Sequence, residues 1–367
     1  MTLPRRLFTV VVAAGLAVGL VACSDASDQP STDGSADGGS TEIVLTGIAD
    51  DTIIPSYRRL GDAFAGLASD LDALCAEPSP DALATAQESW RTVARSWQGT
   101  RGGAVGPSMD RRLMADVAFR ARPDPVEDLL ASDEPIDTET LRSKGSTFHG
   151  ISLMEALLFG EQAIALATPG GARTCEFLVN VLPVSADAVA VVLADWEDGD
   201  EPYRETLAAG PEGDPLGSVD ALTNQVIACL TAIDDNGIRD LALAETLDDA
   251  LSTRRDGPGA FVMAEHRALL DSLATVVEGD PDDDGDGLVA LVAARSPDTA
   301  TRLTELVAAA VGAFAALPDS ADAAYTDAHD DLVAASEAVA ALKVLMTTEV
   351  ASQLGITVRF SDADGDS

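Results

Sequence analysis

The segment STFHGISLMEALLFG, residues Ser146–Gly160, is the most informative stretch of the chain, since it joins a short turn to an apolar run holding a single carboxylate. The apolar residues of this run recur with the period of a helix. Glu155 is its one acidic residue. A carboxylate among apolar side chains loses hydration that only a partner charge, a set of hydrogen bonds or a metal ion can offset. We therefore expect a helix here and a partner for Glu155 elsewhere in the chain. Arg120 and Arg122 are possible salt-bridge partners, although surface positions are the simpler expectation for both.

Helical periodicity extends over most of the remaining chain, and no convincing run of alternating strands is present. Ser79-Pro80 is a cap and first-turn pair, and Gly355 is a C-terminal cap. Other helices are expected at about 51–75, after 80, and at 173–196, 219–234, 259–277, 288–317 with a break near Pro297, and 321–354. The pattern predicts an all-α fold of two antiparallel helical bundles in tandem, at 45–213 and 214–367.

Acidic residues dominate the charge of this 367-residue chain. There are 62 of them against 23 lysines and arginines, for a formal charge of −39. Nothing in this balance would neutralise phosphates, which argues against a nucleic-acid partner. The charge is compatible with attraction of cations, although a solvated acidic surface that keeps the protein soluble is the simpler interpretation.

The N-terminus has the features of a bacterial export signal. Arg5 and Arg6 precede an apolar stretch at 7–21, and Leu20-Val21-Ala22-Cys23 is typical of a lipobox. We expect residues 1–22 to be a cleaved lipoprotein signal peptide and Cys23 to carry the lipid. An uncleaved anchor helix, or an ordinary signal with an incidental cysteine, is the alternative, and each exports the domain. Residues 23–44, rich in Ser, Asp and Gly, are predicted to be a disordered tether to the membrane.

Several motifs, in order along the chain, resemble those of the imelysin-like proteins. GISLMEALLFG resembles their G-x-H-x-x-E helix, in which Gly150 and Glu155 match, Ser152 occupies the position of the motif His, and His149 lies three residues earlier. ESWRTVARSW resembles the Trp-rich second helix of the family, and TEVASQLGITVRFSDADGD resembles its ending. The resemblance covers about residues 45 to 366.

Three cysteines remain after the signal, and an odd number leaves one thiol unpaired. Cys75 and Cys175 resemble paired positions in imelysin-like lipoproteins, so the resemblance implies a disulfide between them. Cys229 would then be the free thiol.

The resemblance also implies a metal site around Glu155 and a role in iron uptake, with envelope iron-transport proteins as partners. The motif His and Glu are the expected ligands, but Ser152 is a poor iron ligand. His149 lies six residues before Glu155, about 120° around a regular helix and about 9 Å along it. It reaches the same ion only if the helix begins at Gly150 and His149 lies on the preceding turn. The candidate metal residues are therefore Glu155, His149 and Ser152.

Peptidase activity and calcium binding are the alternatives to a metal site at Glu155. Peptidase activity is disfavoured, since the chain has three histidines, neither an HExxH motif nor a nucleophile elbow, and no evident catalytic residues. The segment Asp280–Asp286 spaces acids as an EF-hand loop does, but Leu291 stands where a bidentate Glu is required, so calcium there is less favoured than a solvated loop. His266 and His329 are expected on helix surfaces.

The sequence thus predicts a lipid-anchored extracytoplasmic protein on the bacterial cell membrane that binds metal, with iron favoured, as part of metal acquisition. The alternatives are a non-catalytic interaction or scaffold lipoprotein with a degenerate metal site, and a metallopeptidase-like enzyme.

Overall fold

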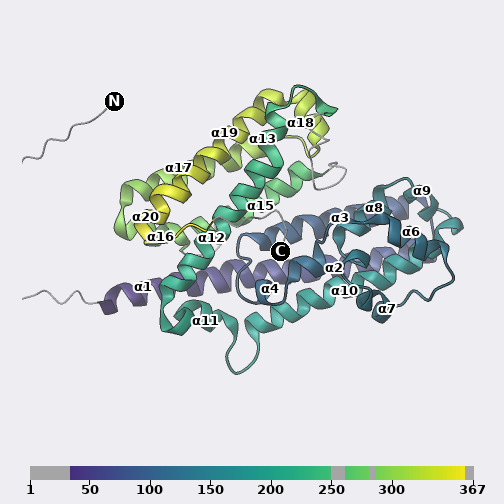
Figure 1. Ribbon diagram of the computed structural model, residues 1–367, viewed down its shortest axis with the longest axis horizontal. Helices are drawn as coiled ribbons and strands as arrows, with labels where there is room; N and C mark the ends of the chain where they lie inside the picture. The colour runs from purple at the N-terminus through teal and green to yellow at the C-terminus, as the bar shows by residue number, and fades with distance from the viewer. Residues whose placement is uncertain (1–33, 249–260, 281–285, 360–367) are drawn as a thin grey trace, which may run out of the picture.

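A computed structural model describes residues 34–248, 261–280 and 286–359, and over these ranges the chain forms helices and no strand. The helices gather into two bundles that lie against each other (Figure 1). The prediction of an all-α fold with two bundles is confirmed.

The first bundle is built from four helices with apolar stripes. They are α2 (Ile54–Ala76), α3 (Pro80–Arg101), α8 (Ile151–Phe159) and α10 (Ala172–Glu197). The Ser79 hydroxyl accepts a hydrogen bond from the Ala82 amide and begins α3 as the sequence predicted. Trp90 and Trp196 are both buried, so they serve as core residues. Burial of these large side chains drives the association of α3 and α10 with α2.

A disulfide joins the end of α2 to the start of α10. The S–S distance between Cys75 and Cys175, the pair that the family resemblance implies, is 2.08 Å and their Cα atoms lie 5.6 Å apart. Cys229 is a buried free thiol, and burial raises its pKa. The first bundle is thus closed covalently at one end.

Short helices and turns connect the long helices of the first bundle and lead to the second. They are α4 (Pro107–Asp110), α5 (Leu113–Val117), α6 (Pro123–Ala131), α7 (Thr138–Ser143), η2 (Ser146–Phe148), α9 (Ala163–Leu166), η3 (Pro169–Gly171), α11 (Tyr203–Ala209) and η4 (Pro211–Gly213). Gly106 begins α4 with φ +54°, and a Cβ atom there would lie 2.1 Å from Cζ of Tyr203. Only glycine suits this turn.

The second bundle holds the remaining helices of the chain. They are α12 (Pro215–Ile233), η5 (Asp234–Ile238), α13 (Arg239–Leu243), α15 (Val262–Glu278), α16 (Leu288–Arg295), α17 (Pro297–Ala315), α18 (Ala321–Asp327), α19 (His329–Leu345), η6 (Met346–Val350) and α20 (Ala351–Leu354). The predicted break near Pro297 is present, because Ser296 ends α16 and caps α17. Gly355 adopts the left-handed conformation expected of a C-terminal cap.

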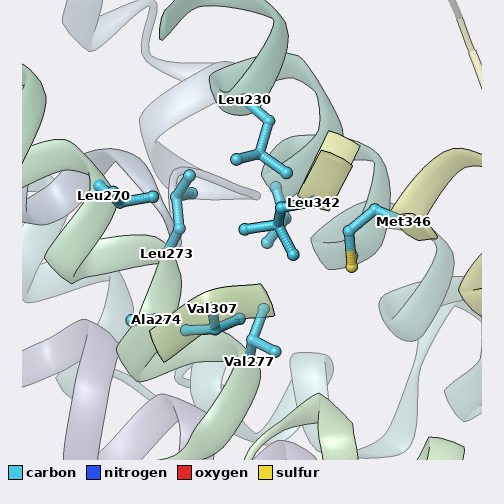
Figure 2. Close-up of a pocket in the computed structure, with 9 residues that line it drawn as sticks. Leu230, Leu270, Leu273, Ala274, Val277, Val307, Leu342 and Met346 are labelled. Carbon is cyan, nitrogen blue, oxygen red and sulfur yellow. The ribbon is translucent and has the colours of Figure 1, made fainter. Parts of the chain in front are cut away.

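The core of the second bundle is aliphatic. Figure 2 shows side chains such as Leu230, Leu273, Val307 and Leu342 around a cavity of about 10 Å³, where α12, α15, α17 and α19 meet. This volume accommodates no more than one water-sized sphere, and the lining offers it no polar partner. The cavity is a small packing gap in a hydrophobic core.

Two of the core helices have the length and composition of membrane spans. The segment Pro169–Glu197 and helix α12 both pass that test, but 44% and 50% of their most apolar windows are buried inside the protein. Both helices contribute several fully buried side chains to their bundles. Their apolar character is accounted for by core packing.

A fully buried carboxylate anchors η5 within the second bundle. Asp234 has no exposed surface and forms ion pairs with Arg239 and Lys343. Lys343 also pairs with Asp235 at 3.1 Å. These pairs tie η5 and α13 to α19, and removing the cations would leave the buried charge of Asp234 without compensation.

The N-terminal helix corrects part of the predicted tether. Helix α1 (Gly34–Gly47) continues through η1 (Ile48–Ile53) into α2 and lies against α11, α12 and α16 (Figure 1). Residues 34–44, expected to be disordered, are therefore helical. Val44 and Leu45 are buried against these neighbours, and this burial offsets the entropy of ordering a polar segment. The predicted signal peptide and Cys23 lie outside the described residues.

The two bundles share a polar seam at the end of α3. The Ser272 hydroxyl of α15 donates to the Gly99 carbonyl at 2.8 Å and accepts from the Gly102 amide at 3.0 Å. Gln225 of α12 donates to the Arg101 carbonyl at 2.8 Å. Side chains of the second bundle therefore satisfy the backbone groups that end α3. The predicted division near 213 falls in η4, and it stays a prediction.

Candidate functional site

Helix α8 is held in place by α3. The Trp90 indole donates to the Ile151 carbonyl at 3.0 Å, and the Gln87 amide donates to the Leu158 carbonyl at 2.7 Å. The helix starts at Gly150, whose φ of +108° and close approach to the backbone of Val117 exclude a side chain. These contacts fix the position from which Glu155 projects.

Glu155 is half-buried, and its pKa rises from 4.5 to about 8. Burial is the larger cause, and the negative charge of Glu265 on α15 is the second. The carboxyl group therefore carries a proton at neutral pH. Arg120 and Arg122 are both exposed, as the simpler expectation of surface arginines had it, and the charge acting on Glu155 is of the same sign. Neither arginine is the partner that the acid was thought to need.

Gln98 of α3 completes the group of polar side chains. Its amide nitrogen lies 3.4 Å from Oε2 of Glu265, while its buried Oε1 has no hydrogen-bond partner among the described residues. A buried acceptor without a donor costs free energy that a bound group can recover. We call Glu155, Glu265 and Gln98 the carboxylate site. It combines side chains from both bundles.

His149 does not point toward this site. The ring is 3% exposed, with Nδ1 3.2 Å from the Asp116 carbonyl oxygen and Nε2 4.0 Å from Oδ1 of Asp116. The same carbonyl accepts a hydrogen bond from Ser185 at 2.7 Å, so the imidazole lies on the side of α5 and α10. Ser152 is half-buried on α8. Across the described residues, no group of three or more His, Cys, Asp or Glu side chains could hold a metal ion.

The structure describes both remaining histidines but only the ends of the predicted calcium loop. His266 was expected on a surface but is only 9% exposed, because its ring packs against the backbone of Gly237. His329 is exposed, beside the ring of Tyr325. The calcium candidate Asp280–Asp286 is interrupted by residues 281–285, which lie outside the described ranges.

Sequence reasoning identified Glu155 but missed Glu265 and Gln98. Glu265 lies within the helix predicted at 259–277, whereas Gln98 is the residue at which helical periodicity weakens; both are near buried positions such as Trp97 and Met263. The sequence indicates only that each is a polar side chain at the edge of an apolar stripe. This pattern does not predict which other helix packs against that edge.

The chain belongs to the imelysin family, whose model matches residues 53–348. Two solved structures share its fold. A putative iron-regulated protein A precursor from Parabacteroides distasonis is 16% identical, with a TM-score of 0.71 over 86% of this chain and 95% of that one. An imelysin-like protein from Psychrobacter arcticum is 18% identical, with a TM-score of 0.70 over 88% and 98%. No curated protein matches the chain significantly.

Proposed function

We propose that this protein is a lipid-anchored extracytoplasmic protein that binds a metal cation as cargo, within a pathway of iron acquisition. Three considerations support the proposal: membership of the imelysin family, the likeness to a protein described as iron-regulated, and the signal peptide that the sequence predicts at 1–22, directly before Cys23. The carboxylate site is the observation that carries it.

The argument for a cation is electrostatic. Glu155 and Glu265 repel each other when both are ionised, and a proton on Glu155 relieves that repulsion. A cation between them attracts both carboxylates, and Oε1 of Gln98 offers a neutral ligand that now lacks a donor. Carboxylate and amide oxygens suit hard cations better than soft ones. The site therefore fits a hard metal ion, bound by few protein ligands together with water.

The remaining parts of the chain suit an envelope location. Removal of residues 1–22 would leave a lipid on Cys23, and the segment from 24 to the start of α1 would space the bundles from the membrane. Envelope iron-transport proteins are the proposed partners. A second cation, calcium at Asp280–Asp286, stays a prediction.

A second candidate function is a scaffold or interaction lipoprotein with a degenerate metal site. This candidate is favoured because the chain differs from the family motif at the position of the motif His and because its nearby histidine is engaged elsewhere. Ser152 stands at the position of the motif His, and His149 is engaged by Asp116. Both candidate functions are compatible with the observed fold.

Calorimetric titration of the chain from Ser24 to Ser367 with ferrous, ferric, zinc and calcium ions separates the two candidates. We expect saturable binding of one ion, weakened more than about tenfold by Glu155→Gln or Glu265→Gln, a loss of at least about 1.4 kcal/mol. Glu278→Gln is the matched control, because Glu278 is another half-buried carboxylate of α15 whose pKa is raised by burial. Weak, salt-sensitive binding that is equal in all four proteins would support the scaffold instead.

A further inference from the structure

We propose that Arg91 is a positioning residue for the carboxylate site, because its guanidinium group packs on two phenyl rings, one at the end of α8 and one directly before α15, the two helices that carry the carboxylates. The inference rests on the proposed function, since it concerns how the same site is held together. Arg91 itself does not touch the cation.

The packing joins three helices. The Cζ atom of Arg91 on α3 lies 4.3 Å from the ring centroid of Phe261 and 5.1 Å from that of Phe159. The two phenyl rings lie 5.2 Å apart, and the Trp90 ring is 5.2 Å from Phe159 and 6.2 Å from Phe261. We call Trp90, Arg91, Phe159 and Phe261 the aromatic clasp.

The clasp sits one helical turn from each carboxylate. Phe159 follows Glu155 by four residues at the end of α8, so these two side chains share a helix face. Phe261 is the residue directly before α15 and precedes Glu265 by four residues, so its ring lies at the end of the helix that carries Glu265. Fixing the two phenyl rings against each other therefore sets the approach of the two carboxylates.

The chemistry of the clasp requires arginine. A guanidinium group is planar and stacks on aromatic faces, whereas an ammonium group is compact and strongly hydrated. Arg91 also donates to Glu88 at 2.9 Å through Nη1, which orients the guanidinium plane along α3. A lysine at this position would keep the charge but lose the flat surface shared by both rings.

The chain offers a matched control in Arg95. This residue lies one turn further along α3, pairs with the same Glu88 at 3.1 Å and lies 3.3 Å from the hydroxyl of Thr92. Arg95→Ala therefore removes an arginine and an ion pair of the same helix while it leaves the clasp intact.

The test measures binding of Fe²⁺, under anaerobic conditions, and of Ca²⁺ to the chain from Ser24 to Ser367 by calorimetry. We expect Arg91→Ala to weaken binding at least about tenfold and Arg91→Lys to recover only part of the loss, while Arg95→Ala stays within about twofold of the wild type. Far-ultraviolet circular dichroism checks that each variant is folded. If Arg91→Ala does not fold, the binding test is made with Arg91→Lys.

A double-mutant cycle with Glu155→Gln separates positioning from general stabilisation. If Arg91 acts through Glu155, the glutamine substitution costs little further affinity in the Arg91→Ala background, whereas independent effects would add. Additive effects, or equal affinities of the Arg91 and Arg95 variants, would overturn the inference and leave the proposed function standing. No binding by the wild type would overturn the proposed function and the inference with it.

Discussion

Replacing Glu155 with glutamine should change how the stability of the metal-free protein depends on pH. In the unfolded chain the carboxyl titrates near 4.5, while in the folded protein its pKa is about 8. Below pH 4.5 both states hold the proton. As the pH rises toward 8 the unfolded state loses it first, so the contribution of Glu155 to stability falls and then levels off above pH 8.

The size of this loss follows from the pKa shift. Moving a pKa from 4.5 to about 8 corresponds to at most about 5 kcal/mol. Because Glu155 is only half-buried, solvent screening lowers the expected value to about 2–3 kcal/mol. Glutamine has nearly the same shape and does not titrate, so the variant lacks this loss.

Urea unfolding with a chelator present, at pH 5 and pH 9, measures the effect. The free energy of unfolding of the wild type minus that of Glu155→Gln should fall by about 2–3 kcal/mol between the two pH values. Taking the difference cancels the titration of the many other acids. Glu161→Gln, at an exposed site just after the same helix, is the control. A difference that stays constant within about 0.5 kcal/mol would refute the buried-carboxylate reasoning.

Three other predictions concern stability. Replacing Cys75 and Cys175 with alanine opens a loop spanning 100 residues and should cost about 4.7 kcal/mol in urea unfolding; a cost below about 1 kcal/mol would contradict the chain-entropy account. Leu273→Ala enlarges the aliphatic cavity of the second bundle and should lower the free energy of unfolding by about 2–5 kcal/mol, whereas Val344→Ala, at a site 59% exposed, should cost less than about 0.5 kcal/mol. Gly106→Ala places a Cβ against the Tyr203 ring at a positive φ and should lower the thermal midpoint by at least about 5 °C; an unchanged midpoint would show that the turn relaxes freely.

The helices were predictable because their determinants are local. Apolar residues at spacings of three and four identify the buried faces of α2, α3 and α10, and the cap at Ser79 and the break at Pro297 depend on neighbouring residues alone. Helix α1 was not predictable in the same way. Its first residues are polar and glycine-rich, and the burial of Val44 and Leu45 depends on α11, α12 and α16, which come much later in the chain.

Of the carboxylate site, only Glu155 was predictable from the sequence. An acid within the apolar run of α8 indicates that Glu155 needs a compensating partner, but the group whose charge acts on it raises its pKa further. The identity of that group depends on which face of α15 meets α3, and helical periodicity does not specify contacts between helices. An arginine was one possible partner, whereas the charge that acts on Glu155 is that of another acid, Glu265. The repulsion between the two carboxylates is relieved when one of them is protonated or when a cation binds to both.

The seam at the end of α3 also restricts how the molecule can move. Gly102 has no room for even one added carbon, since a Cβ there would lie 2.7 Å from the Ser272 carbonyl oxygen. Sliding of one bundle past the other at this point would break the hydrogen bonds that Ser272 and Gln225 form with the end of α3. If the proposed cation binds at the carboxylate site, whose side chains come from both bundles, the seam holds the two sides of that site in a fixed relation.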